Sequence, residues 1–196
     1  MIYKYSEQVE DDFISDVLRL DALVFAPSDQ GTDSSIRARY NANQESLVLA
    51  YNNSEIIGYI CFFPVTNDLS ERIKNEESPF DDNIQPSDIL ASYKNKHDFD
   101  VFLISAAISP EYQGKGTGTE LVNKCLAFLS DKIKSGCKIR KAYSYAFSDA
   151  GARVLAKTGF KELKGVRHSD SGNIVKLMYY CFADYNKLLR RMFMPE

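Results

Sequence analysis

The sequence predicts a mixed α/β fold, built as a single domain over residues 1–196. The chain has 196 residues, of which 44% are hydrophobic, which suffices for one sizeable core, and the usual domain sizes argue against two. Short apolar runs typical of strands alternate with segments whose apolar residues recur every three or four positions, as in amphipathic helices. This alternation favours an α/β sheet over a helical or all-β fold.

The first half of the chain predicts a helix and a hairpin. Residues Asp11–Phe25 carry apolar side chains at helical spacing, and the proline, glycine and small polar residues that follow indicate a loop. The runs Ser46–Tyr51 and Glu55–Val65 are rich in Val, Ile, Tyr and Phe, which favour strands. Because Asn52-Asn53 between them tolerates positive φ, we expect an antiparallel hairpin.

A polar, irregular segment, Thr66–Asp98, separates these strands from the rest of the fold. Its pattern predicts short helical pieces at Asp68–Lys74 and after Pro86. An insertion of this length between core strands is more often functional than a plain connection, so we expect residues 66–98 to border a functional site. Four acidic residues in it either attract a cationic ligand or form a solvated loop face: Glu76, Glu77, Asp81 and Asp82.

The second half predicts a strand, a glycine loop and a helix in direct succession. The apolar run Phe99–Ile108 suits a central strand covered on both faces. After the loop Ser109–Thr117, one helix face that Gly136 ends is marked by Leu121, Val122, Cys125, Leu126, Leu129 and Ile133. The elements expected next are the strand Ile139–Phe147, the helix Asp149–Lys157, the strands Gly159–Val166 and Ile174–Phe182, and a last helix, Asp184–Phe193.

Charge and composition argue against several classes of function. With 24 basic and 27 acidic residues the net charge is −3, so we expect neither nucleic acid nor an anionic membrane surface as a partner. No apolar run has the roughly 20 residues of a membrane span, and the first residues lack a signal-peptide pattern, which predicts a cytoplasmic protein. The four cysteines lie far apart without zinc-site spacing, so we expect buried free thiols and no metal.

Three alternating glycines, Gly114, Gly116 and Gly118, lie between the apolar strand and the amphipathic helix. In such a loop, backbone amides can turn together toward one anion without side chains in the way, although the glycines can also simply join strand to helix. A Walker loop is ruled out because its upstream glycine spacing and the hydroxyl after Lys115 are missing. The dinucleotide fingerprint fails because Thr119 stands at its third glycine.

One segment closely resembles the signature of the GNAT superfamily of N-acyltransferases: Ala106-Ala107-Ile108-Ser109-Pro110-Glu111-Tyr112-Gln113-Gly114-Lys115-Gly116-Thr117-Gly118. The superfamily core Q/R-x-x-G-x-G/A corresponds to Gln113–Gly118. The resemblance continues to Gly159-Phe160 and covers about Phe99–Val166. It implies an α/β (α+β) fold with a mixed, largely antiparallel sheet, helices on both faces and a central pair of strands that splays at a bulge.

The resemblance also implies acetyl-CoA (coenzyme A) as co-substrate, with no metal required. The coenzyme A pyrophosphate would be held by the loop and the helix N-terminus, which gives cofactor-binding roles to Gln113, Gly114, Lys115, Gly116, Thr117, Gly118 and Thr119. The strand before the loop would pair with pantetheine through the backbone of Ala107 and Ile108. Lys115 either adds a charge contact to phosphate or is a solvated loop residue.

The usual catalytic acid of the superfamily is missing here. Several members use a tyrosine in the helix before Gly-Phe, but Leu155 occupies that position and no tyrosine lies between Asp149 and Phe160. Tyr143 and Tyr145 lie on the preceding strand and face the same side by alternation, so either hydroxyl is a substitute acid, unless the rings only pack in the core. We take Tyr145 as the candidate.

The usual general base is missing as well. Members often carry a carboxylate on the strand before the loop, but Val101–Ile108 has no acidic side chain and Ser105 is its only polar group. We interpret Asp100 as a cap or turn residue and His97 as exposed. The sequence therefore predicts a water relay past Ser105 and backbone carbonyls, without one indispensable side-chain base.

These observations predict an N-acetyltransferase that transfers an acetyl group from acetyl-CoA to a primary amine of a small molecule or a protein. Because the usual acid and base are missing, a noncatalytic acyl-CoA-binding sensor or module on the same fold is the alternative. A nucleotide-dependent oxidoreductase is a third interpretation, which the failed dinucleotide fingerprint opposes. The amine acceptor is the expected partner, and assembly into a homodimer stays open. The insertion 66–98 is expected near the acceptor site, where its four acidic residues would attract a cationic amine unless they form a solvated loop face.

Overall fold

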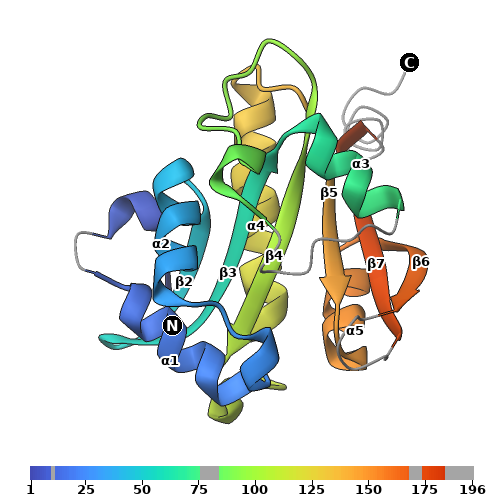
Figure 1. Cartoon of the computed structure of the whole chain (residues 1–196). Coiled ribbons are helices and arrows are strands. Elements are labelled where there is room, and N and C mark those ends of the chain that lie inside the picture. The colour runs from blue at the N-terminus through green and yellow to red at the C-terminus, as the bar shows by residue number, and fades with distance from the viewer. Residues whose placement is uncertain (10–11, 76–83, 168–173, 184–196) are drawn as a thin grey trace, which may run out of the picture.

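The centre of the structure is a seven-stranded sheet, seen in a computed structural model that describes residues 1–9, 12–75, 84–167 and 174–183 (Figure 1). The strands are β1 (Ile2–Tyr5), β2 (Leu47–Asn52), β3 (Glu55–Val65), β4 (Phe99–Ile108), β5 (Ile139–Ala146), β6 (Lys161–Arg167) and β7 (Ile174–Cys181). Their order across the sheet is β1-β2-β3-β4-β5-β7-β6. Among these described strands β4 and β5 are parallel and the other neighbours antiparallel, which confirms the mixed, largely antiparallel sheet.

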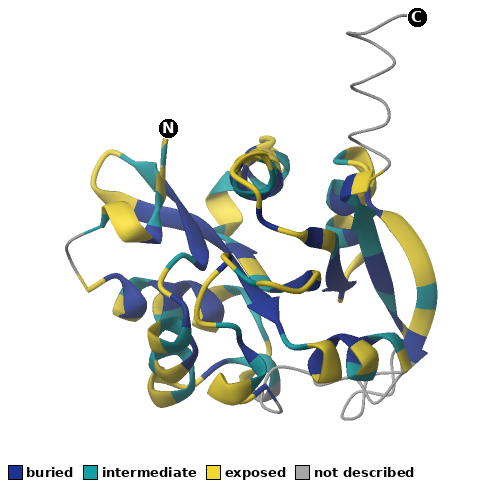
Figure 2. Cartoon of the chain, turned by 90° about the horizontal axis from the view of Figure 1, so that it is seen from above, coloured by how far each residue is buried: buried dark blue, intermediate teal, exposed yellow. Residues whose placement is uncertain are grey.

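Helices cover both faces of this sheet, as predicted. On one face lie α1 (Ile14–Val24), α2 (Asp33–Ala42) and α3 (Asn67–Asn75), which share a core cluster with Leu49, Tyr59 and Phe102. On the other face lie α4 (Thr117–Lys134) and α5 (Asp149–Lys157). Figure 2 shows the buried strands between α4, viewed along its axis, and the helices of the opposite face. None of the described helices is long and apolar enough to cross a membrane.

Most of the predicted elements are present, and two were missed. The hairpin of β2 and β3 turns at Asn53, whose φ is +53°, and α3 confirms a helical piece in the insertion. The loop expected after the first helix instead contains α2, whose N-terminus is capped by Thr32: its side-chain oxygen accepts from Ser35 N at 3.2 Å. Strand β1 was also not predicted. The acidic cluster Glu76, Glu77, Asp81 and Asp82 and the last helix Asp184–Phe193 lie outside the described residues.

A β-bulge interrupts β4 where this strand leaves β5. Opposite β3, Leu103 pairs with Phe62 and Ser105 with Cys61, so Ile104 is an extra residue in β4. On the other side the β4–β5 ladder runs from Phe99↔Ile139 to Leu103↔Ser144, and beyond it the two strands diverge (Figure 1). The splayed central pair is therefore confirmed.

The cysteines are free thiols, and three of the four are buried as expected. Cys61, Cys125 and Cys137 lie in the core, whereas Cys181, at the end of β7, is only half-buried. Burial raises the pKa of the Cys125 thiol well above its ordinary value. This thiol therefore packs as a small apolar side chain.

Near the start of β4, the buried carboxylate of Asp100 connects this strand to β5 and α3. Asp100 is 2% exposed and accepts two hydrogen bonds from Arg140 of β5, from Nε at 3.1 Å and Nη2 at 3.0 Å. The hydroxyl of Ser70 on α3 donates to the same carboxylate. Asp100 therefore has a structural role within β4, and the cap or turn role expected for it is wrong. His97 is exposed, as the sequence suggested.

We predict that Asp100→Asn lowers the free energy of unfolding by about 2 kcal/mol, because it removes a charge that accepts three hydrogen bonds. Arg140 is 42% exposed and can reach water, so the loss should stay below that for a fully buried pair. Asp131→Asn is the control, since Asp131 pairs with Lys134 on the exposed surface of α4. Urea melts that show equal losses for both variants would contradict the structural role.

Candidate active site

The open edge of β4 is the first part of the candidate site. Past the bulge the strand continues to Ile108 beside β3, with Ala107 paired to Tyr59 and Ile108 to Gly58. On its other edge, β4 no longer pairs with β5 here, because the β4–β5 ladder of the described residues ends at Leu103. Backbone groups along an open edge can pair with an extended ligand as they would with a further strand.

The glycine loop that follows brings backbone amides toward one point. Gly114 and Gly116 have φ of +72° and +89°, a left-handed conformation that glycine adopts without strain. A Cβ atom built on either residue would meet nothing within 4 Å, so the space beside both is open. Because Glu120 N bonds Gly116 O at 3.1 Å, the amides of Thr117, Gly118 and Thr119 precede the helical hydrogen-bond ladder. Such amides at a helix N-terminus attract an anion.

Side chains fix the shape of this loop. The side-chain amide of Asn52 donates to the Tyr112 hydroxyl at 2.7 Å, and Lys115 Nζ lies 5.4 Å from the centre of the Tyr112 ring. The buried Thr117 hydroxyl donates to Tyr112 O at 3.4 Å, and the Gln113 side chain donates to Ile108 O at 2.9 Å. The Thr117 hydroxyl thus lies inside the loop, and the backbone amides remain for a ligand.

Gly118 has a packing role in addition. A Cβ atom on it would lie 3.1 Å from Ile108 Cδ1 and 3.7 Å from Val154 Cγ2 of α5. The absence of a side chain therefore lets the first turn of α4 approach the end of β4 and α5 closely. The structure brings the predicted residues Gln113–Thr119 together in one turn beside the open edge of Ala107 and Ile108.

Ser105, a predicted site residue, starts a chain of polar side chains that the sequence analysis missed. Its Oγ lies 3.2 Å from the hydroxyl of Tyr59 on β3, and Tyr59 donates to Asp21 Oδ1 on α1. Burial, the charge of Asp21 and this hydrogen bond raise the pKa of Tyr59 well above its ordinary value. Tyr59 therefore remains a protonated donor, and Ser105 is linked through it to a buried carboxylate.

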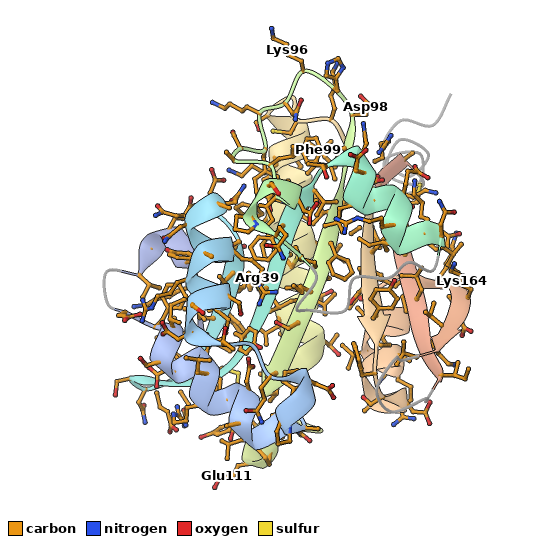
Figure 3. All side chains as sticks on the ribbon, in the orientation of Figure 1. Arg39, Lys96, Asp98, Phe99, Glu111 and Lys164 are labelled. Carbon is orange, nitrogen blue, oxygen red and sulfur yellow. The ribbon has the colours of Figure 1, made fainter. Side chains whose placement is uncertain are left out.

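A small cavity lies beside this chain. Asp21, Tyr59 and Ser105 line it together with Arg39, which points from α2 toward the sheet (Figure 3). Its volume of about 20 Å³ is enough for one water molecule, which needs roughly 10–15 Å³. Arg39 is 4% exposed, so a buried guanidinium and the carboxylate of Asp21 line the same cavity.

The other predicted catalytic residue, Tyr145, lies on β5 on the same face of the sheet. Its ring packs against Phe102, and its hydroxyl donates to the backbone oxygen of Ile73 on α3 at 3.2 Å. Leu155, at the position of the usual acid, lies on α5 and its side chain is buried in the core. The hydroxyl of Tyr145 thus joins α3 to β5.

The comparison with protein families agrees with this geometry. The profile described as "Acetyltransferase (GNAT) family" matches residues 14–160. The match spans most of the sheet, the bulged strand and the glycine loop. The chain belongs to the GNAT acetyltransferase family and is therefore classed as a transferase. A comparison with curated proteins found no match.

Solved structures share the whole fold at low sequence identity. A structure of the NatC complex bound to Gag peptide and CoA has a TM-score of 0.65 at 14% identity, over 92% of this chain and 97% of that one. Arabidopsis thaliana Naa50 with the bisubstrate analogue CoA-Ac-MVNAL gives 0.61 at 14% identity, over 92% and 98%. The GNAT-like decarboxylase GphF with isobutyryl-CoA gives 0.69 at 8%, over 92% and 99%. These likenesses establish the fold alone.

The loop assignment predicts that Gly116→Trp abolishes acetyl-CoA binding, because the ring would fill the open space beside the amides of α4. Gly136→Trp is a matched control at the other end of the same helix: Gly136 also has positive φ, +98°, and open space around its Cβ position. Both substitutions impose backbone strain, but only the first should change affinity in calorimetry. Equal affinities would contradict the anion site.

We predict that Tyr145→Phe lowers stability by about 1 kcal/mol through loss of its bond to Ile73, while kcat stays within tenfold of wild type. An acid catalyst would behave differently, since removing a general acid typically lowers the rate about 100- to 10,000-fold. Thermal melts and initial rates on the same preparation separate the two roles. A loss of that larger size at unchanged stability would make Tyr145 the acid.

Proposed function

We propose that this protein is an N-acetyltransferase that transfers the acetyl group of acetyl-CoA to a primary amine of a small molecule or a protein. One observation carries the proposal: the open edge of β4 leads directly into a loop whose amides face an open space. A substrate with an amide-containing arm and a pyrophosphate fits both parts. Its arm would pair with Ala107 and Ile108, and its pyrophosphate would bind the amides of residues 114–119.

The residues present fit acetyl-CoA in detail. Ile108 O already accepts from Gln113, but a carbonyl oxygen has a second lone pair for the arm. The exposed Lys115 lies beside the loop and can add a charge contact to phosphate. The CoA ligands in the NatC and Naa50 structures support the same choice of substrate.

The acceptor amine would approach from the face of α1 and α2, because Ser105 and Tyr59 lie on that face. Transfer requires the amine nitrogen close to the thioester carbonyl, and backbone amides of the open edge are candidate donors to the carbonyl oxygen. We place the insertion 66–98 at the border of this region, since Ile73 of α3 contacts Tyr145 beside the point where the strands separate. The NatC structure holds a peptide, so peptide amines belong in the test with small amines.

The test is an amine panel with acetyl-CoA: peptides with free N-termini, peptides with lysine, and small primary amines. We expect release of free coenzyme A together with an acetylated product detected by mass spectrometry. Gly116→Trp is the control and should lose both binding and transfer. If calorimetry shows acetyl-CoA binding but no amine is acetylated, the protein is an acyl-CoA-binding module and the proposed activity is wrong.

A further inference from the structure

The polar chain from Ser105 through Tyr59 to Asp21 crosses three elements that are far apart in sequence, and its direction is fixed by hydrogen counting. A phenol has one hydrogen, and Tyr59 gives it to Asp21 Oδ1. The hydrogen between Tyr59 and Ser105, whose oxygens are 3.2 Å apart, therefore comes from Ser105. This leaves the lone pairs of Ser105 Oγ as acceptors at the open edge of β4.

The three groups differ in burial: Ser105 is partly accessible, as the entry point of a proton route must be, and the other two are enclosed. Tyr59 and Asp21 are buried, with 1% and 5% exposure, whereas Ser105 is half-buried and lies just beyond the last β4–β5 pair. The bulge at Ile104 turns Ser105 toward Tyr59, since strict alternation from Leu103 would place it on the other face. One end of the chain thus reaches the substrate side, and the other ends in a carboxylate.

We propose that Ser105, Tyr59 and Asp21 form the route by which the acceptor amine loses its proton, an inference that rests on the proposed acetyltransferase activity. Ser105 Oγ contacts the amine and is the catalytic residue. Tyr59 and Asp21 act through it and are positioning residues. Within Val101–Ile108 the strand offers no other side chain for this task, and the nearby carboxylate of Asp100 is held by Arg140 and Ser70.

The amine nitrogen forms a bond to the thioester carbonyl carbon, and the carbon–sulfur bond breaks after this addition. Bond formation makes the nitrogen acidic, and its proton passes to Ser105 Oγ while Ser105 passes its own to Tyr59 and Tyr59 passes its own to Asp21. Coenzyme A leaves as a thiolate that takes a proton from solvent, and Asp21 returns its proton to solvent before the next turnover.

The experiment compares Ser105→Ala, Ser105→Thr and Tyr59→Phe with wild type, using the amine that the panel shows to be acetylated. We expect kcat to fall about 100-fold in Ser105→Ala and Tyr59→Phe, with the Kd of acetyl-CoA unchanged, because general-base assistance of this kind is typically worth at least that much. Ser105→Thr keeps a hydroxyl on the strand and should recover most of the rate. A residue with a merely structural role would not give this recovery.

A double variant adds a second readout. If the two side chains act as one unit, Ser105→Ala with Tyr59→Phe should lose no more rate than Ser105→Ala alone. Tyr5→Phe is the control for loss of a tyrosine hydroxyl, since Tyr5 donates to Lys124 O at 3.3 Å on the opposite face of the sheet. It should leave kcat unchanged.

The outcomes separate the two proposals. Losses below about tenfold in Ser105→Ala or Tyr59→Phe, or additive losses in the double variant, would overturn the proton route while the acetyltransferase activity stands. Thermal melts with acetyl-CoA establish that each variant is folded. If wild type binds acetyl-CoA and acetylates no amine, the proposed function itself fails, and this inference fails with it.

Discussion

The site depends on one extra residue in β4. Because side chains alternate along a strand, inserting Ile104 puts Ser105 on the face of Tyr59 instead of the face of α4. The same irregularity coincides with the end of the β4–β5 ladder at Leu103 and Ser144, where the Ser144 hydroxyl still donates to Leu103 O at 3.1 Å. A single local feature thus produces both the open strand edge and the polar group beside it.

An anion site is compatible with a net charge of −3 because its attraction is local. The amides at the start of α4 and the glycines with positive φ supply partial positive charge without any basic surface. The position of this loop is fixed from a distance, since Asn52 in the β2–β3 hairpin holds Tyr112. This hydrogen bond ties the loop to the sheet beside the open edge of β4.

The sequence predicted the parts that rest on local pattern. Glycine spacing and the resemblance to the GNAT signature marked the loop Gln113–Gly118, the apolar run Phe99–Ile108 located β4, and apolar periodicity located α4. Helix α2 was missed because it is polar, with Arg39 as a buried residue, so it lacks the apolar stripe on which such predictions depend. The link from Ser105 to Tyr59 and Asp21 could not be predicted, since it joins residues 46 and 38 positions apart through a bulge that shifts the register. The signal for this link in the sequence was Asp21, an acidic residue within the apolar stripe of α1.

The surroundings of the two buried carboxylates, Asp100 and Asp21, favour different roles for them. Asp100 accepts from Arg140 at two points and from Ser70, so its charge is neutralised in place and its lone pairs are used. Asp21 accepts from Tyr59, and the oxygen of Tyr59 also reaches the half-buried Ser105 at the open edge of β4. A buried charge is costly to keep, and a hydrophobic residue on α1 would pack there without that penalty. In the proposed proton route, the connection from Asp21 to the edge of β4 supplies a reason to retain it: the buried carboxylate would act through Tyr59 on a proton at Ser105.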